Sequence, residues 1–115
     1  MNLAVVDMGS NSLHLQVVNP AGQTLHLARA GVRLGDLDQG RLRVQAMDAA
    51  ALALSDFQEQ SRAHGAELRQ ISATAALRDC SNPGDLAQRL GTLNLDLEVL
   101  SGADEAKLIF LGACA

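Results

Sequence analysis

Three short polar segments of this sequence place hydroxyl, amide, guanidinium and carboxylate groups between apolar runs. The first is VVDMGSNSLHLQVV, Val5–Val18, whose polar turn contains Asp7, Gly9, Ser10, Asn11 and Ser12. Glycine lets the backbone approach a ligand closely, and successive N–H groups with hydroxyl donors can form an anion-binding nest. A plain hairpin turn, whose Asn and Ser side chains satisfy their own backbone, accounts for the same residues. Taken alone, the turn favours that simpler interpretation.

The second segment, ISATAALRDCSNP, contains a hydroxyl and a guanidinium at helical spacing. Thr74 and Arg78 are four residues apart, so they share a face if the segment forms a helical turn. Thr74 could then cap the turn, and Arg78 could hold a phosphate group through two hydrogen bonds. A surface arginine paired with Asp79 or Asp104 is an equally good interpretation of Arg78.

The third segment, LSGADEAKLIF, has the pattern of a helix start. Asp104 occupies the place of a capping-box carboxylate, which favours a structural role for it. Glu105 is not needed for that cap and lies about a quarter-turn further round the helix. A carboxylate there that faces a phosphate group could act as a general base for water. The structural alternative is a favourable charge in the first helical turn.

Apolar periodicity and turn residues predict eight elements that position these segments. An apolar run predicts a buried strand at 2–8, and alternation predicts strands at 13–19 and 95–100. A third strand is predicted at 23–30, after the turn Asn19–Gly22, and a short one at 68–73. Helices are predicted from Val44 to Gly65, from the Asn82 cap onward, and from Ser101 to Leu111. The first of these helices has its apolar face at Val44, Met47, Ala51, Leu54 and Phe57. The order β-β-β-α-β-α-β-α indicates an α/β fold.

This order constrains where the three polar segments lie. Tight turns join the first three strands into an antiparallel meander, whereas strands separated by a helix are most simply parallel. The first, fourth and fifth strands then end at one edge of a mixed sheet. Ligands of such sheets bind outside the carboxyl ends of the strands. Because the three segments follow those ends, we expect them to form one site.

Composition limits the class of protein. At 115 residues the chain is long enough for one domain, and 48% apolar content with only two aromatic residues means a core of Leu, Val, Ile and Ala. The net charge of −4 and the scattered basic residues argue against a nucleic-acid surface. We expect no membrane span and no signal peptide. Since Cys80 and Cys114 lack metal-ligand spacing, we expect reduced thiols in a cytoplasmic protein.

Four longer stretches of the sequence resemble one protein family. They are DMGSNSLHL, GVRLGD, ATAALRD followed by NPGD, and EVLSGADEAKLIFLG, which together span nearly all of the chain. In this order they are similar to the N-terminal domain of the exopolyphosphatase and guanosine-pentaphosphate phosphohydrolase family. The first stretch alone also suits the wider actin and sugar-kinase superfamily. The resemblance implies a ribonuclease H-like domain that, with Mg²⁺, hydrolyses a terminal phosphate of inorganic polyphosphate or guanosine pentaphosphate.

The resemblance also implies roles for individual residues. The turn Asp7–Ser12 would be the first phosphate loop, with Asp7 near the metal ion. Arg78 aligns with a family arginine that contacts phosphate, Glu105 with the proposed catalytic glutamate, and Arg33 of GVRLGD with a recurrent basic position that faces the substrate. We expect Asp7, Thr74, Arg78 and Glu105 to surround a space able to hold a phosphate.

The family pattern extends beyond residue 115 into a second domain of similar fold, which carries another phosphate loop and acidic metal ligands. We therefore expect residues 1–115 to be one domain of a two-domain core, with the second domain in cis as its partner. Without that partner, association into a homodimer would cover the exposed edge. The family usually has further acidic residues where this chain has Ala103 and Asp104, which alters the charge beside Glu105.

Two other functions stay open from the sequence. One is a non-catalytic module that binds phosphate or a partner domain through the same edge. The other is a ribonuclease H-like nuclease, which needs several converging carboxylates to hold two metal ions. Only Asp7 and Glu105 are placed for that chemistry, so the nuclease ranks last.

Overall fold

The computed structural model describes residues 2–73 and 80–99 of the chain. The elements in these ranges are β1 (Leu3–Met8), β2 (Ser12–Val18), β3 (Thr24–Gly31), α1 (Val44–Ala63), β4 (Gln70–Ala73), α3 (Pro83–Gly91) and β5 (Asp96–Val99). Their order is the predicted one, and their bounds differ from the predicted bounds by one or two residues. The predicted final helix, 101–111, lies outside the described residues.

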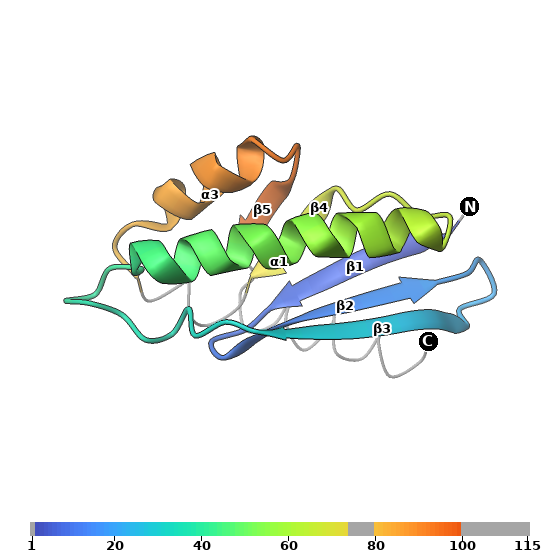
Figure 1. Cartoon of the computed structure of the whole chain (residues 1–115), viewed down its shortest axis with the longest axis horizontal. Helices are drawn as coiled ribbons and strands as arrows, with labels where there is room; N and C mark the ends of the chain where they lie inside the picture. The colour runs from blue at the N-terminus through green and yellow to red at the C-terminus, as the bar shows by residue number, and fades with distance from the viewer. Residues whose placement is uncertain (1, 74–79, 100–115) are drawn as a thin grey trace.

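The five described strands form one mixed sheet in the order β3-β2-β1-β4-β5 (Figure 1). β1 pairs with β2, and β2 with β3, in antiparallel fashion. β4 pairs with β1, and β5 with β4, in parallel fashion. Short turns reverse the chain between the first three strands, whereas each helix returns it to the starting side of the sheet. The predicted meander and the predicted parallel strands are both confirmed.

The core lies between one face of this sheet and the two helices. Alternate residues of β1 and β2 are buried on that face: Ala4, Val6, Met8, Leu13, Leu15 and Val17. From α1, the buried apolar residues are Met47, Ala50, Leu54 and Phe57. The predicted helix face was therefore right in spacing but wrong at two positions. Val44 is 54% exposed because it is the first helical residue, and Ala50 is buried more deeply than Ala51.

The C-terminal end of α1 follows its local sequence signal. The helix ends at Ala63, and Gly65 adopts a positive φ of 70°. That conformation lets the N–H of Ala66 donate to the carbonyl of Ser61 at 2.9 Å, which terminates the helix as predicted. The capping residue His64 stacks on His26 of β3 with ring centroids 4.4 Å apart, which ties this end of the helix to the edge strand.

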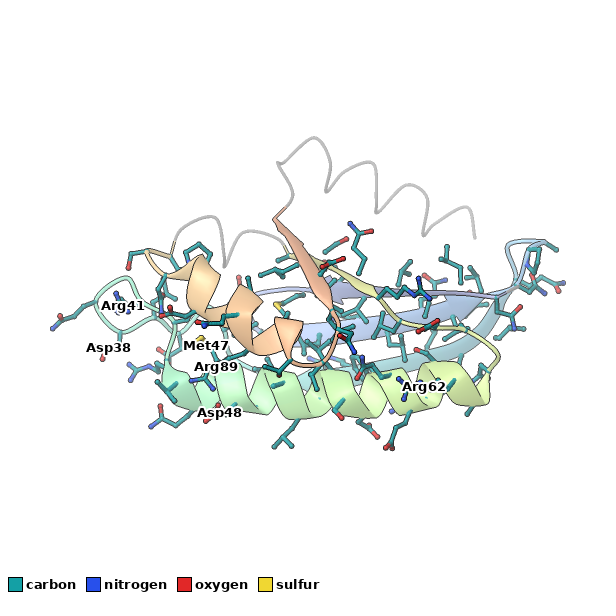
Figure 2. All side chains as sticks on the ribbon, turned by 90° about the horizontal axis from the view of Figure 1, so that it is seen from above. Asp38, Arg41, Met47, Asp48, Arg62 and Arg89 are labelled. Carbon is teal, nitrogen blue, oxygen red and sulfur yellow. The ribbon has the colours of Figure 1, made fainter. Side chains whose placement is uncertain are left out.

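Helix α3 lies beside α1 on the same face of the sheet (Figures 1 and 2). Its Leu86 and Leu90 are fully buried, and Arg89 forms an ion pair with Asp48 of α1. Right-handed crossovers in one direction place both helices on one face. Neither described helix has the length and apolar character that crossing a membrane requires.

We predict that Leu54→Ala lowers the free energy of unfolding by about 2–5 kcal/mol, because Leu54 is fully buried and its truncation leaves a cavity. The matched control is Leu52→Ala in the same helix, where the side chain is 75% exposed. That change should stay within about 0.5 kcal/mol. Urea unfolding followed by circular dichroism measures both values, and equal losses in the two variants would contradict this position of the core.

Candidate functional site

The three parallel strands end side by side at one edge of the sheet. Met8, the last residue of β1, pairs with Ala73, the last residue of β4. Ala73 pairs in turn with Val99, the last residue of β5. The chain therefore leaves the sheet at three adjacent points on the same edge, where α/β sheets bind ligands.

A tight turn follows the first of these strand ends and connects β1 to β2. The N–H of Gly9 donates to the carbonyl of Ser12 at 2.9 Å, which closes the turn. A Cβ atom at Gly9 would lie 3.3 Å from that carbonyl oxygen, so the close approach favours glycine. The N–H groups of Ser10 and Asn11 have no hydrogen-bond acceptor within the described part of the chain. Two adjacent donors of this kind are what an anion-binding nest requires.

The side chain of Ser12 is bonded to a residue that the sequence analysis missed. Its Oγ lies 2.8 Å from Nε2 of His14, which is exposed. In the sheet register His14 lies between Asp7 of β1 and Arg29 of β3, so these side chains share the face opposite to α1. The available signal was the spacing of two residues between Ser12 and His14, which places both on one face of a strand. An imidazole and a guanidinium thus lie near the turn.

Asp7 is the described residue that could contribute to a metal site. Its side chain is partly buried, with Oδ1 buried, and it lies in register with Ser72 of β4. Mg²⁺ is commonly bound in proteins by one or two carboxylates, with water and substrate phosphates as the other ligands. One aspartate beside an anion-binding turn fits that arrangement. Within residues 2–73 and 80–99, no three His, Cys, Asp or Glu side chains gather to hold a metal ion by themselves.

Arg33 lies on the connection from β3 to α1, which reaches the turn. The side chain of Arg33 is exposed, while its neighbours Val32 and Leu34 are buried. Two residues further on, the N–H of Gly35 donates to the carbonyl of Ser10 at 2.8 Å. The structure therefore places Arg33 on a segment in direct contact with the predicted phosphate loop.

Three of the predicted site residues lie outside the described residues, namely Thr74, Arg78 and Glu105. Their assignment stays a prediction. What the structure describes is where their segments begin: Thr74 directly follows Ala73, and the segment containing Glu105 follows Val99. The strand before the first segment thus ends next to β1, and the strand before the second ends one position further along the sheet.

The opposite side of the sheet, where β4 and β5 begin, carries a cavity and an exposed ion pair. A surface cavity of about 340 Å³ lies there, lined by Gln58, Arg62, Glu67, Leu68, Arg69, Leu93 and Asn94. A side-chain hydrogen bond from Arg69 lowers the pKa of Glu67, and the same bond raises the pKa of Arg69. Arg69 precedes the first residue of β4, so this exposed ion pair and the cavity are remote from the strand ends.

The chain was compared with known families and solved structures. The sequence model of the Ppx/GppA phosphatase family matches residues 5–115. An exopolyphosphatase from Cytophaga hutchinsonii is 33% identical, with a TM-score of 0.86 over 96% of this chain and 37% of that protein. A Ppx/GppA family member from Aquifex aeolicus is 22% identical, with a TM-score of 0.82 over 91% of this chain and 36% of that protein.

A more distant likeness shows the fold alone. The ethanolamine utilization protein EutJ from Carboxydothermus hydrogenoformans is 19% identical, with a TM-score of 0.53 over 87% of this chain and 36% of that protein. The fold is thus the ribonuclease H-like domain of the actin-like ATPase superfamily, as predicted. This chain spans little more than a third of the length of each of these proteins. Because the family match runs through nearly the whole chain and the structure superposes closely on family members, the chain belongs to the Ppx/GppA phosphatase family and represents its N-terminal domain.

Proposed function

We propose that this chain forms one wall of the active site of a phosphoanhydride hydrolase, which releases the terminal phosphate of inorganic polyphosphate or guanosine pentaphosphate. The observation that carries this proposal is the turn after β1. It has two adjacent N–H groups without an acceptor among the described residues, at the edge where β4 and β5 also end. The similarity to an exopolyphosphatase supports the reaction class.

In the proposed reaction, water attacks the terminal phosphorus atom while the bond from phosphorus to the bridging oxygen breaks. Glu105 takes the proton of the attacking water as general base. The rest of the substrate leaves with the bridging oxygen, and the terminal group is released as inorganic phosphate. The N–H groups of Ser10 and Asn11, together with Arg78, stabilise negative charge on the phosphoryl oxygens. Asp7 holds Mg²⁺, which supplies further charge neutralisation when it is bound. Arg33 and Thr74 contact the substrate beside the turn.

We propose further that a second domain of the same protein closes the other side of this site. The support is the span of the match, because this chain covers only 37% of the similar exopolyphosphatase. Closure matters for the chemistry, since hydrogen bonds and charges act more strongly on a transition state where bulk water is excluded.

The first test concerns the general base, in a protein where this chain is joined to the second domain of the family. Glu105→Gln should lower kcat by about 10²–10⁴-fold and change KM little, because a base acts in the transition state. The control is the neighbouring carboxylate: Asp104→Asn should lower kcat far less than Glu105→Gln. Phosphate release from polyphosphate measures both, and near wild-type turnover in the Glu105 variant would remove the proposed mechanism.

The second test concerns the metal ion. Chelation of Mg²⁺ should abolish turnover, and Asp7→Asn should raise the Mg²⁺ concentration that gives half-maximal activity, because the amide is a weaker ligand than the carboxylate. Asp96→Asn is the control, since Asp96 is exposed and begins β5 at the opposite edge. An unchanged Mg²⁺ dependence in the Asp7 variant would contradict the assignment.

The third test uses residues 1–115 alone. We expect weak binding of phosphate and no turnover at a family-like rate, because a misplacement of about 1 Å between substrate and water can cost ~100-fold in rate. Release of phosphate from polyphosphate and from guanosine pentaphosphate is measured with Mg²⁺ present. Steady turnover that disappears in Glu105→Gln would show that one domain, or a dimer of it, is sufficient.

A further inference from the structure

The connection from β3 to α1, here called the bridging loop (Val32–Leu42), contacts the phosphate turn at one end. The N–H of Gly35 donates to the carbonyl of Ser10 at 2.8 Å. A Cβ atom at Gly35 would lie only 2.8 Å from Cβ of Ser10 and 3.3 Å from its Oγ. The two backbones therefore meet in a contact that only glycine allows without displacement of the turn.

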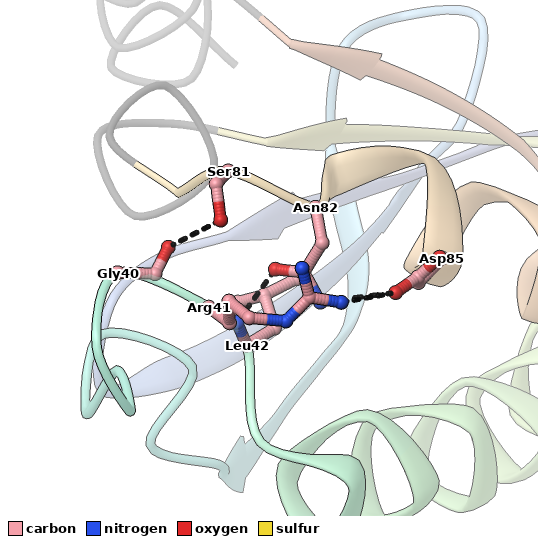
Figure 3. Close-up of polar contacts among 6 residues, drawn as sticks. All are labelled: Gly40, Arg41, Leu42, Ser81, Asn82 and Asp85. Carbon is pink, nitrogen blue, oxygen red and sulfur yellow. Dashed lines mark hydrogen bonds and ion pairs between the residues drawn. The ribbon is translucent and has the colours of Figure 1, made fainter.

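The other end of the bridging loop is bonded to the start of α3 (Figure 3). The carbonyl of Gly40 accepts from the backbone N–H of Ser81 at 2.8 Å and from its Oγ at 3.2 Å. The N–H of Leu42 donates to Oδ1 of Asn82 at 2.7 Å, and Arg41 pairs with Asp85 at 3.5 Å. Of these contacts, the bond to Asn82 is the buried one, since the Asn82 residue is only 8% exposed.

Asn82 corrects the sequence prediction of a side-chain cap. It occupies the N-cap position of α3, followed by the predicted Pro83, but its side chain makes no capping hydrogen bond. An N-cap asparagine normally accepts from a free N–H of its own helix. Here Oδ1 is bonded to Leu42 and Nδ2 donates to Asp85 at 3.1 Å. Helix α3 therefore has no side-chain cap, and the Asn82 side chain binds the bridging loop instead.

Between its two ends the bridging loop is internally fixed. Val32, Leu34 and Leu42 are buried, with exposures of 5%, 0% and 4%. Asp38 and Arg41 are joined by two backbone hydrogen bonds of 2.8 and 3.0 Å around a tight turn. Buried anchors and a closed turn restrict the internal motion of the bridging loop, which is what coupling between its two ends requires.

The hydrogen bond from Gly35 to Ser10 directly affects the Asn11 N–H, one of the two groups proposed to donate a hydrogen bond to phosphate. The carbonyl of Ser10 and the N–H of Asn11 belong to the same peptide group, which is planar and trans. In a trans peptide the C=O and N–H bonds point in opposite directions. The hydrogen bond from Gly35 to the Ser10 carbonyl therefore also sets the direction of the Asn11 N–H. With Gly35 on the carbonyl side, this N–H points away from the bridging loop.

We propose that Asn82 is a positioning residue for the phosphate turn: it holds the bridging loop, and the bridging loop orients the Asn11 N–H through Gly35 and Ser10. The inference rests on the proposed function, in which that N–H binds phosphate. The effect of Asn82 on the orientation of the Asn11 N–H concerns the protein without ligand, so it can be measured separately from phosphate binding.

The experiment compares Asn82→Ala with wild type by ¹H–¹⁵N NMR of the full chain without ligand. Loss of Oδ1 should shift the NMR resonance of the Leu42 amide, which reports the broken bond. It should also shift the resonance of the Asn11 amide and speed hydrogen exchange of the Gly35 amide, which is bonded to Ser10. The rescue is the double variant Asn82→Asp with Asp85→Asn, which keeps an acceptor for Leu42 and reverses the bond between the two side chains instead of setting two carboxylates against each other; it should restore both resonances. Asp85→Asn is the control, because it neutralises the exposed ion pair with Arg41 while its amide oxygen can still accept from Nδ2 of Asn82 and the Asn82–Leu42 bond stays in place. If the Leu42 amide shifts while the Asn11 amide does not, the proposal is wrong.

The second measurement is the affinity of the same proteins for inorganic pyrophosphate, followed at the Ser10 and Asn11 amides. Asn82→Ala and Gly35→Ala should each weaken binding about tenfold, the loss expected for one misdirected hydrogen bond to a charged group. Because both act through one contact, the double variant should be no weaker than either single variant. Gly31→Ala is the control for Gly35, since a Cβ there meets nothing within 4 Å. Additive losses, or an equal loss in Gly31→Ala, would overturn the proposal.

The two measurements separate this inference from the proposed function. If wild type shows no pyrophosphate-dependent shift at the turn, the turn is not a phosphate site and the proposed function fails. The ligand-free response of the Asn11 amide to Asn82→Ala still decides whether Asn82 positions the turn. If Asn82→Ala fails to fold, Asn82→Ser takes its place, because serine is a good N-cap for α3 and its shorter side chain should leave the Leu42 N–H without its acceptor. The response of the Asn11 amide in that variant then gives the same decision.

Discussion

The parallel pairing of β1 with β4 and of β4 with β5 is the constraint on which the rest of the structure depends. Each parallel pair needs a crossover, and crossovers of one hand and one direction place α1 and α3 on the same face of the sheet. The same pairing brings three strand ends to one edge. A covered face for the core and three adjacent strand ends are therefore two results of one hydrogen-bonding pattern.

Much of the fold could be predicted because its signals are local. The apolar run of β1, the alternation in β2, the glycine at position 65 and the proline that begins α3 each act within a few residues. The mixed sheet followed from the order of the elements and from how strands can be connected. The same reasoning located the edge at which the three strands end, and with it the position of the turn after β1.

The contacts of the bridging loop could not be predicted, because they join residues far apart in the sequence. Asn82 was predicted in the correct place as a cap, but its oxygen is bonded to Leu42, 40 residues earlier. The contact of Gly35 with Ser10 likewise depends on the path of the bridging loop over the sheet edge. His14 was missed because an exposed polar residue in an alternating strand is typical of a solvent-facing position. The roles of Thr74, Arg78, Glu105 and Arg33 stay predictions.

The two turn amides that have no acceptor among the described residues have a consequence for how the protein tolerates variation. A substitution replaces a side chain and leaves the peptide group in place, so the donors of Ser10 and Asn11 survive most changes at their own positions. The sensitive positions are instead those that support the peptide from elsewhere in the chain, such as Gly35. A site built from side chains is vulnerable where it touches its ligand, whereas a site built from backbone is vulnerable at a distance from it.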